Sequence, residues 1–359
     1  MQIHLFADSL AEGWPSMDRY ARSLYRALRT VAPEADVRLL VPPTPPAKNN
    51  AAVILWRLLI YPFWAHRQQG EVNHVIDHSY GHLLIALNPS HTVVTVHDIA
   101  PLIFPGRGWG LSSLAWRLAL KNMQRTRHLV TDSAFIAAQL RRRLKGVNAR
   151  VIPLGVDTCF HQFSSSELER ARRWLALPDG PFLLHVGHTQ PRKNLEGLLQ
   201  ALTILHRKGH RVPLVQVGGW PSSAQMALIG NLGLEHSVHF WGRADEKTLL
   251  SLYNLAAVLV FPSFYEGFGL PVLESMACGT PVVAANAAAL PEVVGDAGLL
   301  VNPKDPESIA EAIARILDDS SLADDLRWRG LERARRFTWR RTAEKTLVFY
   351  RQILSGAKK

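Results

Sequence analysis

The sequence predicts an α/β protein built from two doubly wound parallel sheets. Its 359 residues exceed the size at which a single hydrophobic core usually stops growing. Short apolar runs alternate with helical patterns, and the runs are apolar on both faces, which is typical of parallel strands covered by helices on both sides. The runs fall into two sets, so we expect two domains with one sheet each.

Each apolar run ends in a Gly, Pro, Asp or Ser turn, which marks the carboxyl end of a strand. In the first half the strands are expected in IHLFA, VRLLV, NHVIDHS, TVVTVHD, HLVTDS and RVIPLGV. In the second half they are expected in FLLHVG, PLVQVGG, VHFWG, AVLVFPS, PVVAAN and GLLV.

The polar helical stretch SSSELERARRWLAL separates the two strand sets. We therefore predict an N-terminal Rossmann-like domain at 1–160 and a second Rossmann-like domain at 161–337. A C-terminal helix at 338–359 is expected to pack back on the first domain. Ligands of open parallel sheets bind outside the carboxyl ends of the strands, so two facing sheets predict a central cleft.

Composition limits the class of protein. Only two cysteines are present, which argues for a reducing compartment, and the opening MQIHLFAD lacks the basic start and apolar core of a signal peptide. We therefore expect a cytoplasmic protein. The longest apolar stretch, residues 51–65, is shorter than the ~20 residues that span a bilayer, and a buried or surface helix is favoured over a membrane-seated one.

The positive charge is uneven. The net charge is +11; residues 1–160 hold 18 Lys and Arg against 10 Asp and Glu, whereas residues 161–359 hold 23 against 20. An anionic partner of the first half is therefore expected, with lipid headgroups or a phosphorylated acceptor favoured over nucleic acid, for which no signature is present. The spacing in WRLALKNMQRTR predicts Arg117, Lys121 and Arg125 on one helical face, close to Arg127.

The most specific segment is FPSFYEGFGLPVLESMACGTPVV, residues 261–283. A strand, the flexible turn EGFG and a short helix starting around Pro271 are expected, with Gly279 closing that helix. Backbone N–H groups at a helix N-terminus form a ready anion site. Glu266 and Glu274 then face different parts of a ligand and suit sugar or ribose hydroxyls; the alternative is that Glu266 caps the helix and Glu274 is solvated.

A second strand-to-helix turn lies in LLHVGHTQPRKNLEGLL, residues 183–199. Arg192 and Lys193 stand at the mouth of a helix that begins near Asn194. Cations are unfavourable at a helix N-terminus unless an anion lies between, so the turn predicts a diphosphate site, with a solvated basic turn as the alternative. Lys193→Ala is expected to weaken diphosphate binding while leaving the fold intact.

Three histidines follow strands in the first half. His97 ends the strand in TVVTVHD at its carboxyl edge, where sites form, although a hydrogen-bonded core histidine is an equal alternative. His78 and His82 have the spacing of a metal pair but lack clear partners, and no metal is predicted.

These segments together resemble glycosyltransferase family 4, the retaining enzymes of the GT-B fold, over nearly the whole chain. EGFGLPVLE matches the E-x7-E element of the family, followed by GTPVVAAN and LPEVVGDAGLLV. VGHTQPRKNL, VHFWGRADEKTLLSLY, VHDIAPLIFP and IPLGVD match other parts in the expected order. The fold class implied is two Rossmann-like domains of the GT-B type. The resemblance implies that the first domain, 1–160, binds the acceptor and that the second, 161–337, binds the nucleotide sugar.

The resemblance also implies roles. Gly187, Arg192 and Lys193 would bind the donor diphosphate, and the loop at Gly242–Arg243 would border the base. Glu274 would hold the ribose and Glu266 the transferred sugar. The backbone of Phe268, Gly269 and Leu270 would contact the sugar and the phosphate. His97 would come from the other domain to touch the sugar near the reacting centre. Gly13 would belong to a phosphate or acceptor loop.

Two departures from the family pattern stand out. His188 occupies a position where many members have Arg, and the first loop, EGWPSMDRY, has a single glycine, Gly13, in place of a pair. Both put a phosphate contact in doubt.

The resemblance is strongest to bacterial mannosyl- and rhamnosyltransferases of surface polysaccharide synthesis. It implies a GDP-sugar as co-substrate, no other cofactor, and a glycan or polyprenyl-diphosphate-linked acceptor at the inner face of a membrane. A nucleotide-sugar 2-epimerase of the same fold and a non-enzymatic polyanion-binding protein remain alternatives. A nicotinamide dehydrogenase would need G-x-G-x-x-G after the first strand, which DSLAEGWPS lacks.

Overall fold

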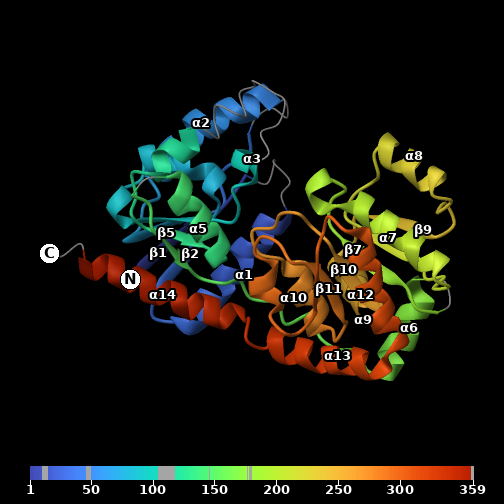
Figure 1. Cartoon of the computed structure of the whole chain (residues 1–359). Coiled ribbons are helices and arrows are strands. Elements are labelled where there is room, and N and C mark those ends of the chain that lie inside the picture. Colours follow the sequence, from blue (N-terminus) through green and yellow to red (C-terminus); the bar gives the residue numbers. More distant parts are fainter. Residues whose placement is uncertain are drawn as a thin grey trace. The chain divides into compact units, whose positions relative to one another are not determined.

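The computed structural model describes residues 1–9, 15–45, 50–103, 118–144, 146–175, 177 and 180–356. The chain divides into two compact units (Figure 1). Unit 1 consists of Met1–Gly155 and Trp339–Lys359, and unit 2 of Val156–Thr338.

Unit 1 contains a parallel sheet whose described strands run in the order β2-β1-β3-β4-β5-β6. Its elements are β1 (Gln2–Phe6), α1 (Pro15–Val31), β2 (Asp36–Leu40), α2 (Asn50–His66), β3 (Val72–Val75), β4 (Thr92–Val96), α3 (Ala100–Ile103), β5 (Leu129–Thr131), α5 (Ala134–Arg143), β6 (Ala149–Val151) and α14 (Trp339–Gly356), with 3₁₀ turns η2 (His78–Ile85) and η3 (Pro89–His91). The chain order reverses between β1 and β3, which is a topological switch point.

Helix α14 belongs to unit 1 although it ends the chain (Figure 1). It packs along α1, and Trp339 lies 5.8 Å from the Tyr20 ring. The buried Tyr350 hydroxyl lies 2.5 Å from Nδ1 of His74, whose Nε2 contacts the hydroxyl of Thr95 at 2.6 Å. These bonds satisfy polar groups in the centre of the unit and fix the last helix to the sheet.

Unit 2 holds a second parallel sheet, in the order β12-β11-β10-β7-β8-β9. Its elements are α6 (Ser165–Leu175), β7 (Leu183–Val186), η4 (Pro191–Lys193), α7 (Leu195–Arg207), β8 (Leu214–Val217), α8 (Ser223–Asn231), β9 (Val238–Gly242), α9 (Glu246–Leu255), β10 (Val258–Phe261), α10 (Leu270–Ala277), β11 (Val282–Ala285), α11 (Leu290–Val294), β12 (Leu299–Val301), α12 (Pro306–Asp318) and α13 (Ser320–Ala334). Here the switch point lies between β7 and β10. The predicted doubly wound α/β architecture is confirmed in both units.

Buried strands and amphipathic helices explain the second core. The strands β7, β8, β10 and β11 are buried along their whole length, as parallel strands between two helical layers must be. Helices α7 and α12 pack against each other and contribute Leu198, Leu202, Ile309 and Ile313 to the apolar cluster. This core fixes the strand ends from which the candidate site is built.

Helix α2 is apolar on both its inner and its outer face. Its inner face buries Trp56 and Tyr61, while Leu59 and Phe63 on the outer face are each 60% exposed. Among the described residues, no helix is long and apolar enough to cross a membrane.

One helical prediction needs correction. The described helix that carries Lys121 covers residues 118–123, and Arg125 lies in the turn that follows. The expected single face therefore does not continue to Arg125, and Arg117 lies outside the described residues. Lys121, Arg125 and Arg127 are nevertheless all exposed.

Candidate active site

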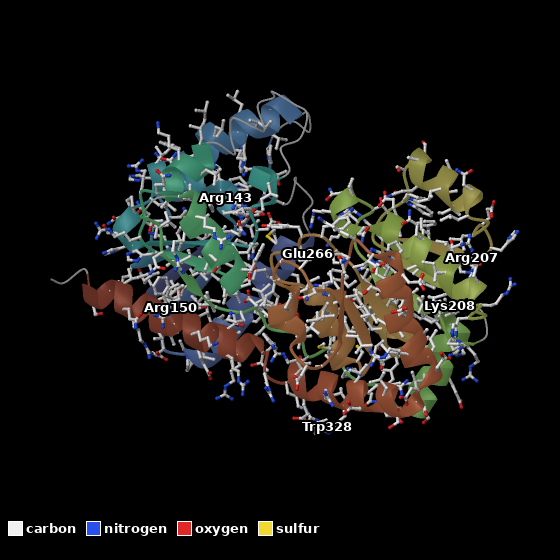
Figure 2. All side chains as sticks on the ribbon, in the orientation of Figure 1. Arg143, Arg150, Arg207, Lys208, Glu266 and Trp328 are labelled. Carbon is white, nitrogen blue, oxygen red and sulfur yellow. The ribbon has the colours of Figure 1, made fainter. Side chains whose placement is uncertain are left out.

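The switch point of unit 2 carries a buried ion pair. Lys193 follows β7 and Glu266 follows β10, and their Nζ and Oε1 atoms lie 2.6 Å apart. Both side chains are only 10% exposed. Arg192 reaches the other carboxylate oxygen at 3.7 Å. The two loops that the sequence singled out separately therefore meet at the point where α/β sheets bind ligands. Figure 2 shows Glu266 on the loop before α10.

Asn194 holds this lysine in place. It adopts a left-handed backbone with φ 59° and caps α7 by accepting a hydrogen bond from the N–H of Gly197. Its side-chain amide also donates to the carbonyls of Pro262 and Pro303. The turn after β7 is thereby tied to the loop after β10, and the helix indeed begins beside Asn194 as predicted.

Three cations gather around His188. Its pKa is lowered, first by burial and then by the charges of Lys193, Arg192 and Arg243. Arg243 follows β9, so the cations come from two strand ends of the same sheet. With Glu266 as the carboxylate among them, this edge carries an excess of positive charge that suits a diphosphate. A histidine that stays neutral beside three cations can still donate one hydrogen bond to a phosphate oxygen.

Helix α10 begins at Leu270, next to Pro271, as the sequence predicts. Gly269 is its N-cap with φ 122°, and a Cβ there would lie 2.8 Å from Leu290, so only glycine fits. The N–H groups of Phe268, Gly269 and Leu270 donate to no acceptor among the described residues. Unpaired N–H groups at a helix N-terminus are what an anion or a sugar oxygen can use. Gly279 ends the helix in the expected left-handed conformation, φ 75°.

Glu274 is buried inside α10 and not solvated. It is 4% exposed, and its Oε2 accepts a 2.8 Å hydrogen bond from the hydroxyl of Tyr253 on α9. Glu266 is not a helix cap either, because the N-cap of α10 is Gly269 and no side chain caps it. The structure therefore excludes both alternatives, a helix-capping role for Glu266 and a solvated Glu274.

Gln216 and Tyr253 are two residues of this site that the sequence did not reveal. Gln216, in the middle of β8, donates a 2.7 Å hydrogen bond to the carbonyl of Gly187 and so orients the turn that precedes Lys193. Tyr253 fits the helical pattern around it and signals no site. A buried glutamine within an otherwise apolar parallel strand was the one available hint.

His97 lies at the carboxyl end of β4 in unit 1, as predicted, and is 8% exposed. Its Nδ1 lies 2.7 Å from Oδ2 of Asp132, and its Nε2 lies 2.8 Å from the carbonyl oxygen of Ile76. Both partners are acceptors, so both ring nitrogens must donate and the ring is an imidazolium. Burial alone would lower the pKa of His97, but Asp132, Asp77 and the Ile76 carbonyl outweigh it and raise the pKa to about 9.

Acidic side chains line the strand ends around His97. Asp8 follows β1, Asp77 follows β3 and Asp132 follows β5, and all are buried. Burial alone would raise the pKa of Asp77, yet His78 and His97 hold it well below its ordinary value. Asp8 and Asp77 flank the switch point of this sheet. At the carboxyl edge of unit 1, buried carboxylates therefore surround the imidazolium of His97.

The structure thus brings most of the predicted donor residues together in unit 2. The residues after β7, β9 and β10 share one sheet edge, and His97 lies in unit 1; Gly13 lies outside the described residues. Among the described residues no three His, Cys, Asp or Glu side chains are placed to share a metal ion.

Family models match both units. The model described as Glycosyltransferase Family 4 matches residues 6–160, and the model described as Glycosyl transferases group 1 matches residues 168–333. The chain belongs to glycosyltransferase family 4. Its two Rossmann-like units are those of the GT-B fold.

Two curated relatives of this family member are each 40% identical to it. One is the O-antigen chain mannosyltransferase B of Escherichia coli, matched over 175 residues, 48% of this chain and 46% of the relative. The other is a D-inositol 3-phosphate glycosyltransferase of Acidothermus cellulolyticus, matched over 220 residues, 57% of this chain and 48% of the relative. The chain thus spans about half the length of each of these relatives.

A solved structure matches over the full length. Sucrose-phosphate synthase from Thermosynechococcus elongatus is 25% identical, with a TM-score of 0.79 over 99% of this chain and 100% of that one. This likeness supports the GT-B fold of the family.

Proposed function

We propose that the protein is a retaining hexosyltransferase that uses a nucleotide sugar as donor. The observation that carries the proposal is the buried contact of Lys193 with Glu266 at the switch point of unit 2. It stands beside two further cations and beside the unpaired N–H groups at the start of α10. Cations and helix N–H groups bind a diphosphate, and the neighbouring carboxylates bind hydroxyls.

The proposed reaction is a front-face displacement. The bond from the anomeric carbon to the diphosphate oxygen breaks, and a bond to the acceptor oxygen forms on the same face. The proton of the acceptor hydroxyl passes to the leaving diphosphate. Lys193, Arg192 and the N-terminus of α10 would stabilise the charge that develops on the diphosphate, which is an electrostatic contribution. We propose no metal, because cations already fill this role.

Each donor-binding residue receives a role in this proposal. Glu266 binds the transferred sugar once the donor diphosphate draws Lys193 away from it, and Glu274, oriented by Tyr253, binds the ribose. Gly187 and Arg243 border the diphosphate and the base. Both ring nitrogens of His97 already hydrogen-bond, to Asp132 and to the carbonyl of Ile76. We therefore propose that His97 either contacts the sugar through its backbone or fixes the position of the end of β4.

For the sugar we propose mannose, with rhamnose as the second choice, from a GDP-linked donor. Two segments support this choice, PRKN at residues 191–194 and the pair His97–Asp98, because in them the chain resembles bacterial enzymes that add mannose-type sugars. The name of the O-antigen mannosyltransferase supports it too. The acceptor we propose is a glycan, carried on a polyprenyl diphosphate during surface polysaccharide synthesis. The D-inositol 3-phosphate glycosyltransferase is also 40% identical to this chain, so a phosphorylated inositol is the competing acceptor class.

We also propose that unit 1 works at an anionic membrane surface on the cytoplasmic side. The apolar outer face of α2, with Leu55, Leu59, Ile60 and Phe63 exposed, supports this, because a helix that is apolar all round needs an apolar partner. Residues 50–66 contain no Asp or Glu. The exposed cations Lys121, Arg125 and Arg127 add attraction for anionic headgroups.

A donor screen followed by an acceptor assay tests the function. Thermal shift is measured with GDP, UDP, ADP and their mannose or glucose conjugates, because a ligand of the folded state raises apparent stability. We expect GDP and GDP-mannose to stabilise the protein most. Transfer is then measured with a polyprenyl-diphosphate-linked oligosaccharide and with inositol 3-phosphate, with and without EDTA, and the anomeric configuration of the product is read by NMR.

Each rival has its own outcome in this assay. Conversion of the donor into its 2-epimer without acceptor would identify an epimerase. Stabilisation by heparin or polyphosphate, without any selective nucleotide, would identify a polyanion-binding protein. An inverted product would reject the retaining mechanism.

A further inference from the structure

The side chain of Trp220 is largely exposed, although its ring is large and mostly apolar. It is 70% exposed, and no large apolar side chain among the described residues is more so. It follows Gly218 and Gly219 in the loop after β8, next to the cation-lined turn after β7. Exposed tryptophans of this kind are typical of binding surfaces, because the ring offers a large flat area with little conformational freedom.

The backbone of Trp220 is held on both sides. Its carbonyl accepts a 2.8 Å hydrogen bond from the hydroxyl of Thr189, in the loop after β7. Two residues later Ser222 and Gln225 form a capping box at the start of α8, and Gln225 also donates to the carbonyl of Thr189. The loop is thus rigid while its indole remains exposed. A preorganised group loses little entropy when a ligand binds.

Glycines bring the Trp220 loop close to the proposed diphosphate site. Gly218 has φ 112°, and a Cβ on it would lie 2.9 Å from the carbonyl oxygen of Gly187. A Cβ on Gly219 would lie 3.2 Å from the N–H nitrogen of Thr189. Larger residues would separate the two loops. The loop after β8 is therefore in direct backbone contact with the turn that leads to Lys193.

One edge of the indole rests on the end of β9. A Cβ on Gly242 would lie 3.3 Å from Cζ2 and 3.5 Å from Nε1 of Trp220, and Gly242 has φ 67°. Gly242 therefore leaves the room that the indole occupies. The remaining surface of the ring is open, and Arg243 follows directly in sequence.

We propose that Trp220 is the stacking platform for the base of the nucleotide, and that this stacking favours purines. The inference rests on the proposed function, since it assumes a nucleoside diphosphate at the Lys193 turn. A diphosphate bound there carries its ribose and base along the same sheet edge. The open face of Trp220 and the guanidinium of Arg243 flank that path. A purine has the larger face and gains more from stacking than a pyrimidine.

Calorimetric titrations of the full chain test the proposal, with GDP, UDP and inorganic diphosphate as probes. Trp220→Ala should weaken GDP binding about 10- to 100-fold, the range that base–aromatic stacking spans. The loss for UDP should be smaller, and the affinity for inorganic diphosphate should not change. Trp220→Phe should retain most of the GDP affinity. Trp328 on α13 is 64% exposed and points outward (Figure 2), so Trp328→Ala is the matched control and should bind like the parent.

The outcomes separate this proposal from the proposed function. Parental GDP affinity in Trp220→Ala overturns the stacking platform and leaves the transferase proposal in place. A loss of inorganic diphosphate affinity in the same variant also overturns it, because Trp220 would then only support the loop. A parent protein that binds inorganic diphosphate but no nucleotide overturns the proposed function itself.

Discussion

The carboxyl edges of the two sheets are built alike but carry opposite electrostatics. In unit 1 the strand-end histidine, His97, lies between carboxylates and its pKa is raised to about 9. In unit 2 the strand-end histidine, His188, lies among cations and its pKa is lowered. The same residue type at a comparable place in the fold is charged in one unit and neutral in the other. Neighbouring charges decide this, not the architecture.

This contrast separates local from overall charge. Residues 1–160 have the larger excess of Lys and Arg, 18 against 10 Asp and Glu, and yet their strand ends are acidic. Many of the described basic residues of unit 1 are exposed instead, such as Arg143 on α5 and Arg150 on β6, both labelled in Figure 2. Net charge therefore reports on outer surfaces and says little about a site. We infer that anion binding inside a site belongs to unit 2.

The largest expected effect comes from breaking the buried pair of unit 2. Lys193→Ala should lower the free energy of unfolding by about 3–5 kcal/mol, because it leaves the buried Glu266 with only the more distant Arg192, at 3.7 Å. The structure thus revises the expectation that this variant keeps the fold intact. Lys193→Ala combined with Glu266→Ala should recover part of the loss, since no charge is then left alone. Urea unfolding at neutral pH measures both.

An exposed pair supplies the control for this prediction. Lys208 and Glu307 form an ion pair with side chains 42% and 49% exposed, and Figure 2 shows Lys208 at the surface. Lys208→Ala should lower the free energy of unfolding far less than Lys193→Ala, because the charges of an exposed ion pair are screened by water. Equal losses in Lys193→Ala and Lys208→Ala would show that burial does not strengthen the site pair.

The sequence predicts the backbone of this site better than its side-chain contacts. The start and end of α10 can be predicted from the sequence, because the backbone conformations that Gly269, Pro271 and Gly279 favour are those of helix ends. The contact of Lys193 with Glu266 is different, because it depends on β10 pairing with β7 across the switch point. Strand order is set by packing over the whole unit, and no local pattern encodes it.

The same distinction explains which features the sequence did not predict correctly. Tyr253 contacts Glu274 only because α9 packs against α10, which neither segment specifies alone. The helix with Lys121 was expected to run through Arg125 because the spacing of cations was regular. Helices end where packing and hydrogen bonds end them, and charged residues on the surface do little to prevent it.

The second prediction separates the two glutamates of unit 2. Glu266→Gln should lower kcat about 10²- to 10³-fold with a small change in donor KM, because its charge is expected to act on the reacting sugar. Glu274→Gln should instead raise the donor KM, since ribose binding is equal in ground and transition states. Steady-state kinetics with varied donor measures both. Glu311→Gln, exposed on α12, should match the parent. Identical kinetic profiles for the two site variants would reject separate roles.

The third prediction concerns the imidazolium of unit 1. The pKa of His97 is higher in the folded state than its ordinary value of 6.5, so its stabilising contribution is complete below pH 6.5 and is lost as the pH rises through about 9. A shift of this size corresponds to about 3 kcal/mol. Parent stability should therefore fall between pH 7 and pH 9.5, and His97→Asn should remove most of that slope.

His236→Asn is the control, because His236 is exposed and should leave the pH profile unchanged. Urea unfolding at several pH values gives the slopes. A parent profile that is flat from pH 7 to pH 9.5 would mean that His97 is neutral, and the acid edge of unit 1 would then lack its central cation.

The smallest expected effect concerns the outer surface of unit 1. Phe63 is 60% exposed on α2, and the guanidinium of Arg67 lies 4.2 Å from its ring centroid. If this face meets lipid, Phe63→Glu should lower the fraction bound to vesicles of phosphatidylglycerol and phosphatidylcholine about tenfold, because burial of such a side chain is worth about 1.5–3 kcal/mol. Val348→Glu, 46% exposed on α14, adds the same charge elsewhere and should bind like the parent.

Salt then separates the apolar from the electrostatic part of this binding. Attraction between exposed cations and anionic headgroups is screened over about 10 Å at 0.1 M salt, whereas burial of Phe63 is not screened. Parent binding should therefore fall with salt to a residual level, and Phe63→Glu should lose that residual. Equal recovery of the parent on anionic and neutral vesicles at low salt would reject the membrane surface. The donor site would stand regardless, since the residues assigned to it lie in unit 2, apart from His97 and Gly13.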